Sequence, residues 1–223
     1  MTSRVWNVTR VARFVDANYL IKVCAVTSPS DADLVATAGA TALGIIVTES
    51  PRRVSLERAR EISAEVAGRI SRVAVVRHVD AEDVRRVLDT VDVDALQVHG
   101  GLRRGVAEVA GDHDVALIEA LSIESLDVRS TDADAYLIDG PQPGSGRTHS
   151  WREVLARSWD RPLIVAGGLT ADNVVSVLNE VGPWGCDVAT GSETSPGIKD
   201  PARVQSFVLA ARQYFEDREE SRG

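Results

Sequence analysis

Short apolar runs alternate with longer polar segments along almost the whole chain. Eight runs are rich in Val, Ile and Leu, and they lie at residues 19–26, 41–48, 72–78, 95–100, 115–121, 135–140, 162–169 and 186–193. Most of them are continuously apolar over four to six residues rather than strictly alternating. Runs of this kind are typical of strands buried on both faces, as in parallel sheets. The pattern therefore predicts eight buried parallel strands.

The polar segments between these runs carry helix signals. Ser28-Pro29 and Asp200-Pro201 each offer an N-cap residue followed by proline at the first helical position. Residues 150–153 have the spacing of a capping box, and residues 55–68 have apolar positions at helical spacing and end in glycine. Eight strand–helix units at a repeat of roughly 25 residues favour a (β/α)8 TIM barrel of the α/β class over a doubly wound open sheet.

No Pro/Gly/Ser-rich linker divides the chain, so we expect one barrel domain over residues 19–215. Residues 1–18 precede the first strand as an N-terminal extension, whose apolar spacing would allow a short amphipathic helix. Residues 216–223 form a charged tail that we expect to fray.

Composition excludes several other classes of protein. The 223 residues are 44% hydrophobic and 26% charged, which is ordinary for a globular protein with a sizeable core. The net charge is -8 without a basic block, which disfavours a nucleic-acid partner. There is neither an apolar run of the ~20 residues that a membrane helix requires nor a secretory h-region, so we expect a cytoplasmic protein. Cys24 and Cys186 lie far apart without metal-type spacing, so we expect neither a disulfide framework nor a bound metal.

The ends of the predicted strands carry the candidate chemistry, because active sites of such barrels lie at the carboxyl ends of the strands. Cys24 could be an inert small hydrophobe or, as a thiolate, a general base. Asp139 closes a buried strand, where structural pairing and catalysis are both open. Arg52 suits a solvated face or carboxylate recognition, and His99 could be a polar group satisfied by the backbone.

Glycine-rich turns follow the last two predicted strands. Gly167 and Gly168 leave the seventh strand, and Thr190-Gly191-Ser192 leaves the eighth. Glycine lets backbone N–H groups approach an anion closely, and the loops after strands seven and eight form the recurrent phosphate site of this barrel. In either segment alone the glycines could serve only to form a tight turn, but the two segments together favour phosphate binding.

Eight segments, in order, resemble phosphoribosylanthranilate isomerase, an enzyme family of tryptophan biosynthesis. They are IKVCAVT, the run from Asp31 through GATALGIIV, SPRRVS, ALQVHG, YLIDG, PGSGRTHSW, GGLTADNV and DVATGSETSPGIKD. The resemblance implies that Cys24 is the general base, Asp139 the general acid and Arg52 the ligand of the anthranilate carboxylate. It also implies that substrate-binding residues include His99, Gly146, Gly167, Gly168, Asp187, Thr190, Gly191 and Ser192, with Gly146, Gly168 and Gly191 around the phosphate and Asp187 near the sugar hydroxyls.

The implied reaction is an Amadori rearrangement of a small phosphosugar by acid–base catalysis, without a metal or other cofactor, in a monomer or homodimer. Several features depart from the family pattern. Ala25 stands for a usual glycine, the strand GIIV lacks the usual phenylalanines, and Pro143-Gly144, Gly101-Leu102 and Ala189-Thr190 replace a glycine pair, acidic residues and a serine pair; the N-terminal extension is also extra. These departures leave open that the protein is a divergent paralogue of the family.

Other functions also stay open. A related aminoaldose-phosphate isomerase with an altered or dual substrate is one, although the resembling histidine-pathway enzyme has a carboxylate at the position of Cys24. A second is a phosphate-ligand-binding barrel that has lost catalysis. A dinucleotide-dependent oxidoreductase is weaker, because no GxGxxG follows the first strand.

Overall fold

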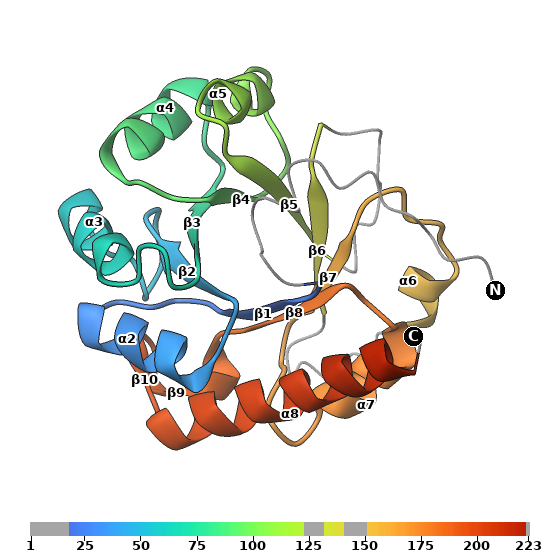
Figure 1. Ribbon diagram of the computed structural model, residues 1–223. Coiled ribbons are helices and arrows are strands. Elements are labelled where there is room, and N and C mark those ends of the chain that lie inside the picture. The colour runs from blue at the N-terminus through green and yellow to red at the C-terminus, as the bar shows by residue number, and fades with distance from the viewer. Residues whose placement is uncertain (1–17, 123–131, 141–150, 222–223) are drawn as a thin grey trace.

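Eight parallel strands close into a barrel in the computed structural model of the protein, which describes residues 18–122, 132–140 and 151–221 (Figure 1). The strands are β1 (Leu20–Val23), β2 (Ala42–Ile46), β3 (Ser71–Arg77), β4 (Ala95–His99), β5 (Ala116–Ser122), β6 (Ala135–Asp139), β7 (Leu163–Ala166) and β8 (Gly185–Val188). Each pairs with the next along the chain, and β8 pairs with β1 to complete the ring. Each strand begins inside or within one residue of a predicted run, and the predicted (β/α)8 barrel is confirmed.

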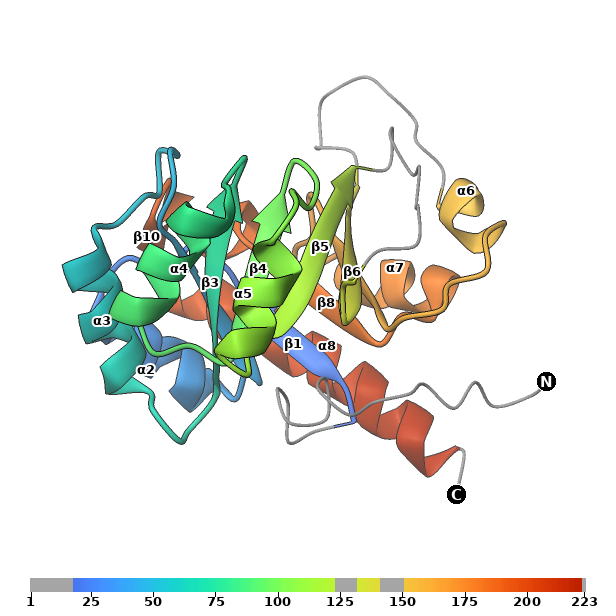
Figure 2. The same cartoon turned by 90° about the horizontal axis from the view of Figure 1, so that it is seen from above.

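Helices surround the strands (Figures 1 and 2). They are α2 (Pro29–Ala38), α3 (Leu56–Glu65), α4 (Ala81–Thr90), α5 (Val106–Asp112), α6 (Arg152–Leu155), α7 (Val174–Val181) and α8 (Pro201–Glu220). The predicted starts of two helices are confirmed: Ser28 caps α2 through the amide of Asp31, and Asp200 caps α8 through the amides of Ala202 and Arg203. Residues 1–17 and Ser150 of the expected capping box lie outside the described residues. In the described part of the chain, no helix has both the length and the apolar character needed to cross a membrane.

The core has two layers because alternate strand residues face opposite sides of the barrel wall. The layer between strands and helices is mostly aliphatic and includes Val23, Leu43 and Ile138. The layer inside the barrel includes Leu20, Val73 and other apolar side chains. This double burial explains why the strands read as continuous apolar runs.

Two regions near the C-terminus differ from the expectation. The turn expected at 190–192 is a short 3-10 helix, η1 (Thr190–Ser192), and it is followed by a hairpin that the sequence did not predict, made of β9 (Glu193–Ser195) and β10 (Ile198–Lys199). The charged tail predicted to fray is helical as far as Glu220, because α8 packs beside β1 and α7 (Figures 1 and 2). Phe215 of α8 stacks on Tyr19 with ring centroids 4.7 Å apart.

Candidate active site

A cavity of about 1260 Å³ opens at the carboxyl ends of the strands. It brings together most of the predicted site, from the first strand to the last: Cys24, Arg52, His99, Asp139, Gly167, Gly168, Asp187, Thr190 and Gly191. Gly146 lies outside the described residues, and Ser192 is fully buried and does not line the cavity. The strand ends, which are local features of the sequence, therefore converge on one site.

Cys24 follows β1, and its backbone is held on both sides. Its N–H donates to the carbonyl of Val188 at 2.7 Å, and its carbonyl accepts a hydrogen bond from Lys199 Nζ at 2.6 Å. A Cβ on Gly44 would lie 2.8 Å from the Cys24 Sγ, so the glycine in β2 leaves the space that the thiol uses. Burial raises the pKa of the Cys24 thiol, and the charge of Lys22 opposes that rise.

Lys22 and Asp187 form a buried ion pair beside this thiol, with Nζ and Oδ1 2.9 Å apart. A Cβ on Gly44 would also lie 3.0 Å from Lys22 Nζ, which places the ammonium next to Cys24. Burial alone lowers the pKa of Lys22, but the charge of Asp187, followed by that of Cys24, outweighs this and raises it. The sequence reasoning missed Lys22, although a charge inside an apolar strand run was a visible signal.

Asp139 ends β6, on another side of the cavity from Cys24. Its side chain is exposed to the cavity, yet the surrounding protein raises the pKa of its carboxyl through desolvation, and the charge of Asp187 raises it further. Gly167 has φ +87°, and a Cβ there would lie 2.8 Å from Asp139 Oδ1. The raised pKa favours the protonated form, which is the form that a general acid requires.

His99 lines the same cavity as a neutral imidazole. Burial, followed by the charges of Arg77 and Lys22, lowers the pKa of His99 to about 4. The side-chain amide of Gln97 donates to His99 Nε2 at 2.8 Å, which agrees with an unprotonated ring nitrogen there. Gln97, which the sequence reasoning did not single out, is buried on β4 two residues before His99 and faces the same side of the wall.

The two glycine turns touch each other at one end of the cavity. A Cβ on Gly191 would lie 2.0 Å from the carbonyl oxygen of Leu169, so only glycine allows this approach. Asn173 braces the turn after β7, since its Nδ2 donates to the carbonyl of Gly168 and its Oδ1 accepts from the amide of Thr170. Close, braced backbone of this kind suits an anion such as a phosphate.

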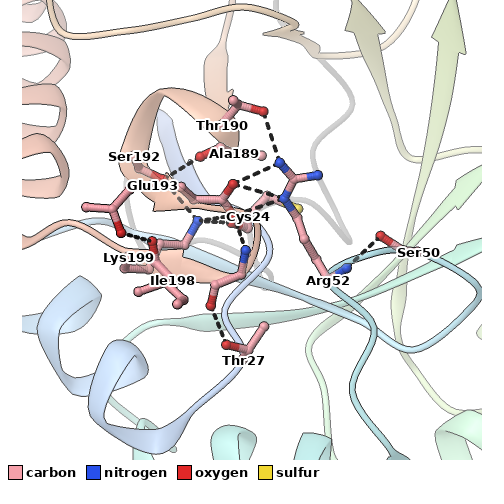
Figure 3. Close-up of polar contacts among 12 residues, drawn as sticks. Cys24, Thr27, Ser50, Arg52, Ala189, Thr190, Ser192, Glu193, Ile198 and Lys199 are labelled. Carbon is pink, nitrogen blue, oxygen red and sulfur yellow. Dashed lines mark hydrogen bonds and ion pairs between the residues drawn. The ribbon is translucent and has the colours of Figure 1, made fainter.

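Arg52 reaches the cavity from the loop after β2, where Glu193 holds it (Figure 3). Its Nε lies 3.0 Å from both carboxylate oxygens of Glu193, and its Nη2 donates to Oε2 at 2.8 Å. The same Nη2 donates to the hydroxyl of Thr190 at 3.3 Å. Glu193 is 3% exposed and, like Lys199, was not among the residues expected at the site.

Ser192, expected to bind substrate, is buried outside the cavity lining. Its hydroxyl donates to the carbonyl of Ala189 at 2.7 Å and accepts from Lys199 Nζ at 3.0 Å. Its amide also donates to Ala189. Both groups therefore stabilise the turn after β8 from within, and the neighbouring Thr190 and Gly191 face the cavity instead.

Comparison with known proteins identifies the family of this chain. The sequence model of the family described as N-(5'-phosphoribosyl)anthranilate (PRA) isomerase matches residues 21–210. The chain belongs to this family. An N-(5'-phosphoribosyl)anthranilate isomerase of Cereibacter sphaeroides is 31% identical over 211 residues, covering 88% of this chain and all of the relative. Another of Haloferax volcanii is 36% identical, covering 86% and 92% of the two chains.

Solved structures give the same result. TrpF from Jonesia denitrificans has a TM-score of 0.78 at 33% identity, covering 88% of this chain and 98% of that chain. A phosphoribosylanthranilate isomerase in complex with reduced 1-(o-carboxyphenylamino)-1-deoxyribulose 5-phosphate has a TM-score of 0.75 at 26% identity, covering 87% and 99%. The likeness thus extends over the whole barrel.

One departure from the family pattern has a structural consequence. Ala25 stands where the family usually has glycine. Its φ is +65°, a backbone conformation that residues other than glycine rarely adopt. It is fully buried directly after Cys24. Lys199 Nζ, bound to the preceding carbonyl, helps to hold this strained backbone in place.

Proposed function

We propose that this chain catalyses the Amadori rearrangement of N-(5-phosphoribosyl)anthranilate to 1-(2-carboxyphenylamino)-1-deoxyribulose 5-phosphate, a step of tryptophan biosynthesis. The observation that carries the proposal is that Cys24 and Asp139 face one cavity from different strands. Arg52 and the glycine turns after β7 and β8 line that cavity too. A phosphate at the turns and an aryl carboxylate at Arg52 would hold the sugar between the two acid–base groups.

In the first step Asp139 acts as general acid. It donates its proton to the furanose ring oxygen as the C1–O bond breaks, and the nitrogen lone pair forms the C1=N bond of a protonated Schiff base. The raised pKa of Asp139 supports this role, because the carboxyl retains its proton at a higher pH than an ordinary aspartate does.

In the second step Cys24, as a thiolate, removes the proton from C2. The C–H electron pair forms the C1=C2 bond, and the C1=N pair returns to nitrogen, which gives an enolamine. Protonation at C1 and loss of the proton from the C2 hydroxyl then give the ketone. Lys22 supports this step, because its ammonium beside the thiol stabilises the negative charge of the thiolate.

The test is steady-state turnover of freshly generated phosphoribosylanthranilate, followed by the loss of its fluorescence. We expect Cys24→Ala and Asp139→Asn each to lose about 100-fold or more in kcat, the usual contribution of a positioned acid or base. The matched control is Cys186→Ala, since Cys186 is fully buried in the outer core layer. Near-normal turnover in both active-site variants would contradict the proposed roles.

The wider setting is part of the same proposal. A chain of this composition would act in the cytoplasm on a small phosphosugar, as a monomer or homodimer, and without a nucleic-acid partner. The reaction moves protons within one molecule and requires neither a metal nor a redox cofactor. Gel filtration at several concentrations would distinguish the monomer from the homodimer.

A further inference from the structure

Glu193 is a buried carboxylate that the proposed reaction does not use. It belongs to β9 and binds the guanidinium of Arg52 (Figure 3). Arg52 lines the cavity, whereas Glu193 does not. Burying a carboxylate is costly unless it is fully paired. The arrangement of its partners therefore indicates what it does.

The contacts leave one edge of the Arg52 guanidinium for another ligand. Glu193 occupies the side formed by Nε and Nη2. No hydrogen bond involves Nη1 among the residues that the structure describes, and the side chain is 20% exposed. Nη1 can therefore donate to a second carboxylate. Nη2 can complete a bidentate pair with that carboxylate where the ligand replaces the 3.3 Å hydrogen bond to Thr190.

The position of Glu193 itself is fixed from the other side. Its Oε1 accepts from the amide of Gly197 at 3.2 Å and lies 3.4 Å from Lys199 Nζ. Burial alone raises the pKa of Glu193, but the hydrogen bond from Arg52 and the charge of Lys199 outweigh it and lower that pKa. Glu193 is therefore ionised at neutral pH.

The charges around Glu193 still leave Arg52 attractive to an anion. The negative charge of Glu193 is shared between Arg52 and Lys199, so it does not cancel the charge of the guanidinium completely. Lys199 Nζ also donates to the carbonyl of Cys24. One polar network thus connects the carboxylate-binding arginine to the backbone of the general base (Figure 3).

We propose that Glu193 is a positioning residue for recognition of the substrate carboxylate: it holds Arg52 by one edge so that the other edge faces the ligand. The inference rests on the proposed function, because it takes the carboxylate-bearing substrate from there. A guanidinium fixed in advance loses less conformational freedom on binding than a free one. Glu193 therefore contributes to the affinity for ligands that carry the carboxylate and not to the affinity for the sugar phosphate.

The experiment compares two ligands by calorimetry. One is 1-(2-carboxyphenylamino)-1-deoxyribitol 5-phosphate, and the other is the same molecule without the carboxyl group. We expect Glu193→Gln to weaken binding of the first ligand about tenfold or more, as for a lost charged hydrogen bond, and binding of the second less than about threefold. In turnover, the same variant should raise KM and leave kcat within about threefold.

Two further variants separate positioning from other causes. In an Arg52→Gln background Glu193→Gln should have no additional effect, because it acts through the guanidinium. The matched control is Glu65→Gln, which removes an exposed carboxylate at the end of α3 that does not line the cavity, and it should leave binding of both ligands unchanged. Glu193→Asp keeps the charge but shortens the side chain, so it should fold and still lose affinity selectively for the first ligand.

Each outcome decides the question. A wild type that binds neither ligand overturns the proposed function and this inference with it. A wild type that binds both equally overturns the role of Arg52. If the wild type discriminates but Glu193→Gln weakens both ligands alike, or still acts in the Arg52→Gln background, Glu193 is purely structural and the proposed function stands.

Discussion

Lys22 and Asp187 act on the Cys24 thiol in opposite directions, since the charge of Lys22 lowers its pKa and the charge of Asp187 raises it. Lys22→Met removes the favourable charge and leaves Asp187 unbalanced, so the pKa of Cys24 should rise. Because one pKa unit changes the thiolate fraction tenfold at a fixed pH, alkylation by iodoacetamide at pH 8 should slow about tenfold. The rates are compared in a Cys186→Ala parent, where Cys24 is the remaining thiol.

Two further variants test the direction in which each charge shifts the pKa of Cys24. Asp187→Asn should lower the pKa of Cys24 and speed alkylation, and the double variant should lie near the parent, because it removes both opposing charges. A rate that falls in both single variants would mean that the pair acts by packing rather than by charge. Lys199, which also lowers the pKa of Cys24, is unchanged throughout.

At the scale of elements, the turns after β7 and β8 fit together through Gly191. Gly191→Ala would place a methyl group 2.0 Å from the carbonyl oxygen of Leu169 and force the two turns apart. We expect KM for the phosphosugar to rise about tenfold, because the backbone groups that face the phosphate would separate. The control is Gly101→Ala, at φ +87° with open space around it: it should lose stability but retain KM. An unchanged KM in Gly191→Ala would place the phosphate elsewhere.

The last turns of α8 contribute to stability rather than to the site. Phe215 is 4% exposed and stacks on Tyr19, so Phe215→Ala should reduce the free energy of unfolding by about 3 kcal/mol while kcat stays unchanged. Leu209→Ala on the same helix, 67% exposed, should change it by less than about 0.5 kcal/mol. Urea unfolding measures both. Equal effects in the two variants would mean that the end of α8 does not dock.

The C-terminal elements show what a local sequence pattern can and cannot predict. The charged residues after 215 indicated fraying, but Arg218 donates to the carbonyls of Gly182 and Pro183, which no local pattern reveals. The glycine turn at 190–192 is visible in the sequence, but the hairpin of β9 and β10 after it is not, because strands of three and two residues are too short to show a hydrophobic period. Tertiary contacts decided both.

At the scale of the whole molecule, the strand ends could be predicted and their partners could not. Each strand of the barrel is buried on both faces, so it is visible as a local run, and the closed ring then brings Cys24 and Asp139 to one cavity. The pairs that tune the site, Lys22 with Asp187 and Arg52 with Glu193, join distant parts of the chain. The first pair depends on the register of β1 against β8, and the second on how the loop after β2 meets β9; the sequence pattern contains neither.

Burial of His99 in the folded barrel makes the free energy of unfolding depend on pH. Its pKa is about 4 in the folded state, below the ordinary value of 6.5, so the unfolded chain binds a proton over a range where the folded protein does not. The free energy of unfolding should therefore be unaffected by this group above about pH 6.5 and should fall as the pH decreases from there to about 4. His99→Gln should flatten that part of the profile, whereas His113→Gln should not, since Asp89 raises the pKa of His113. Urea unfolding from pH 7.5 to 4 measures this, and an equally steep decline in His99→Gln would assign the pH dependence to other groups.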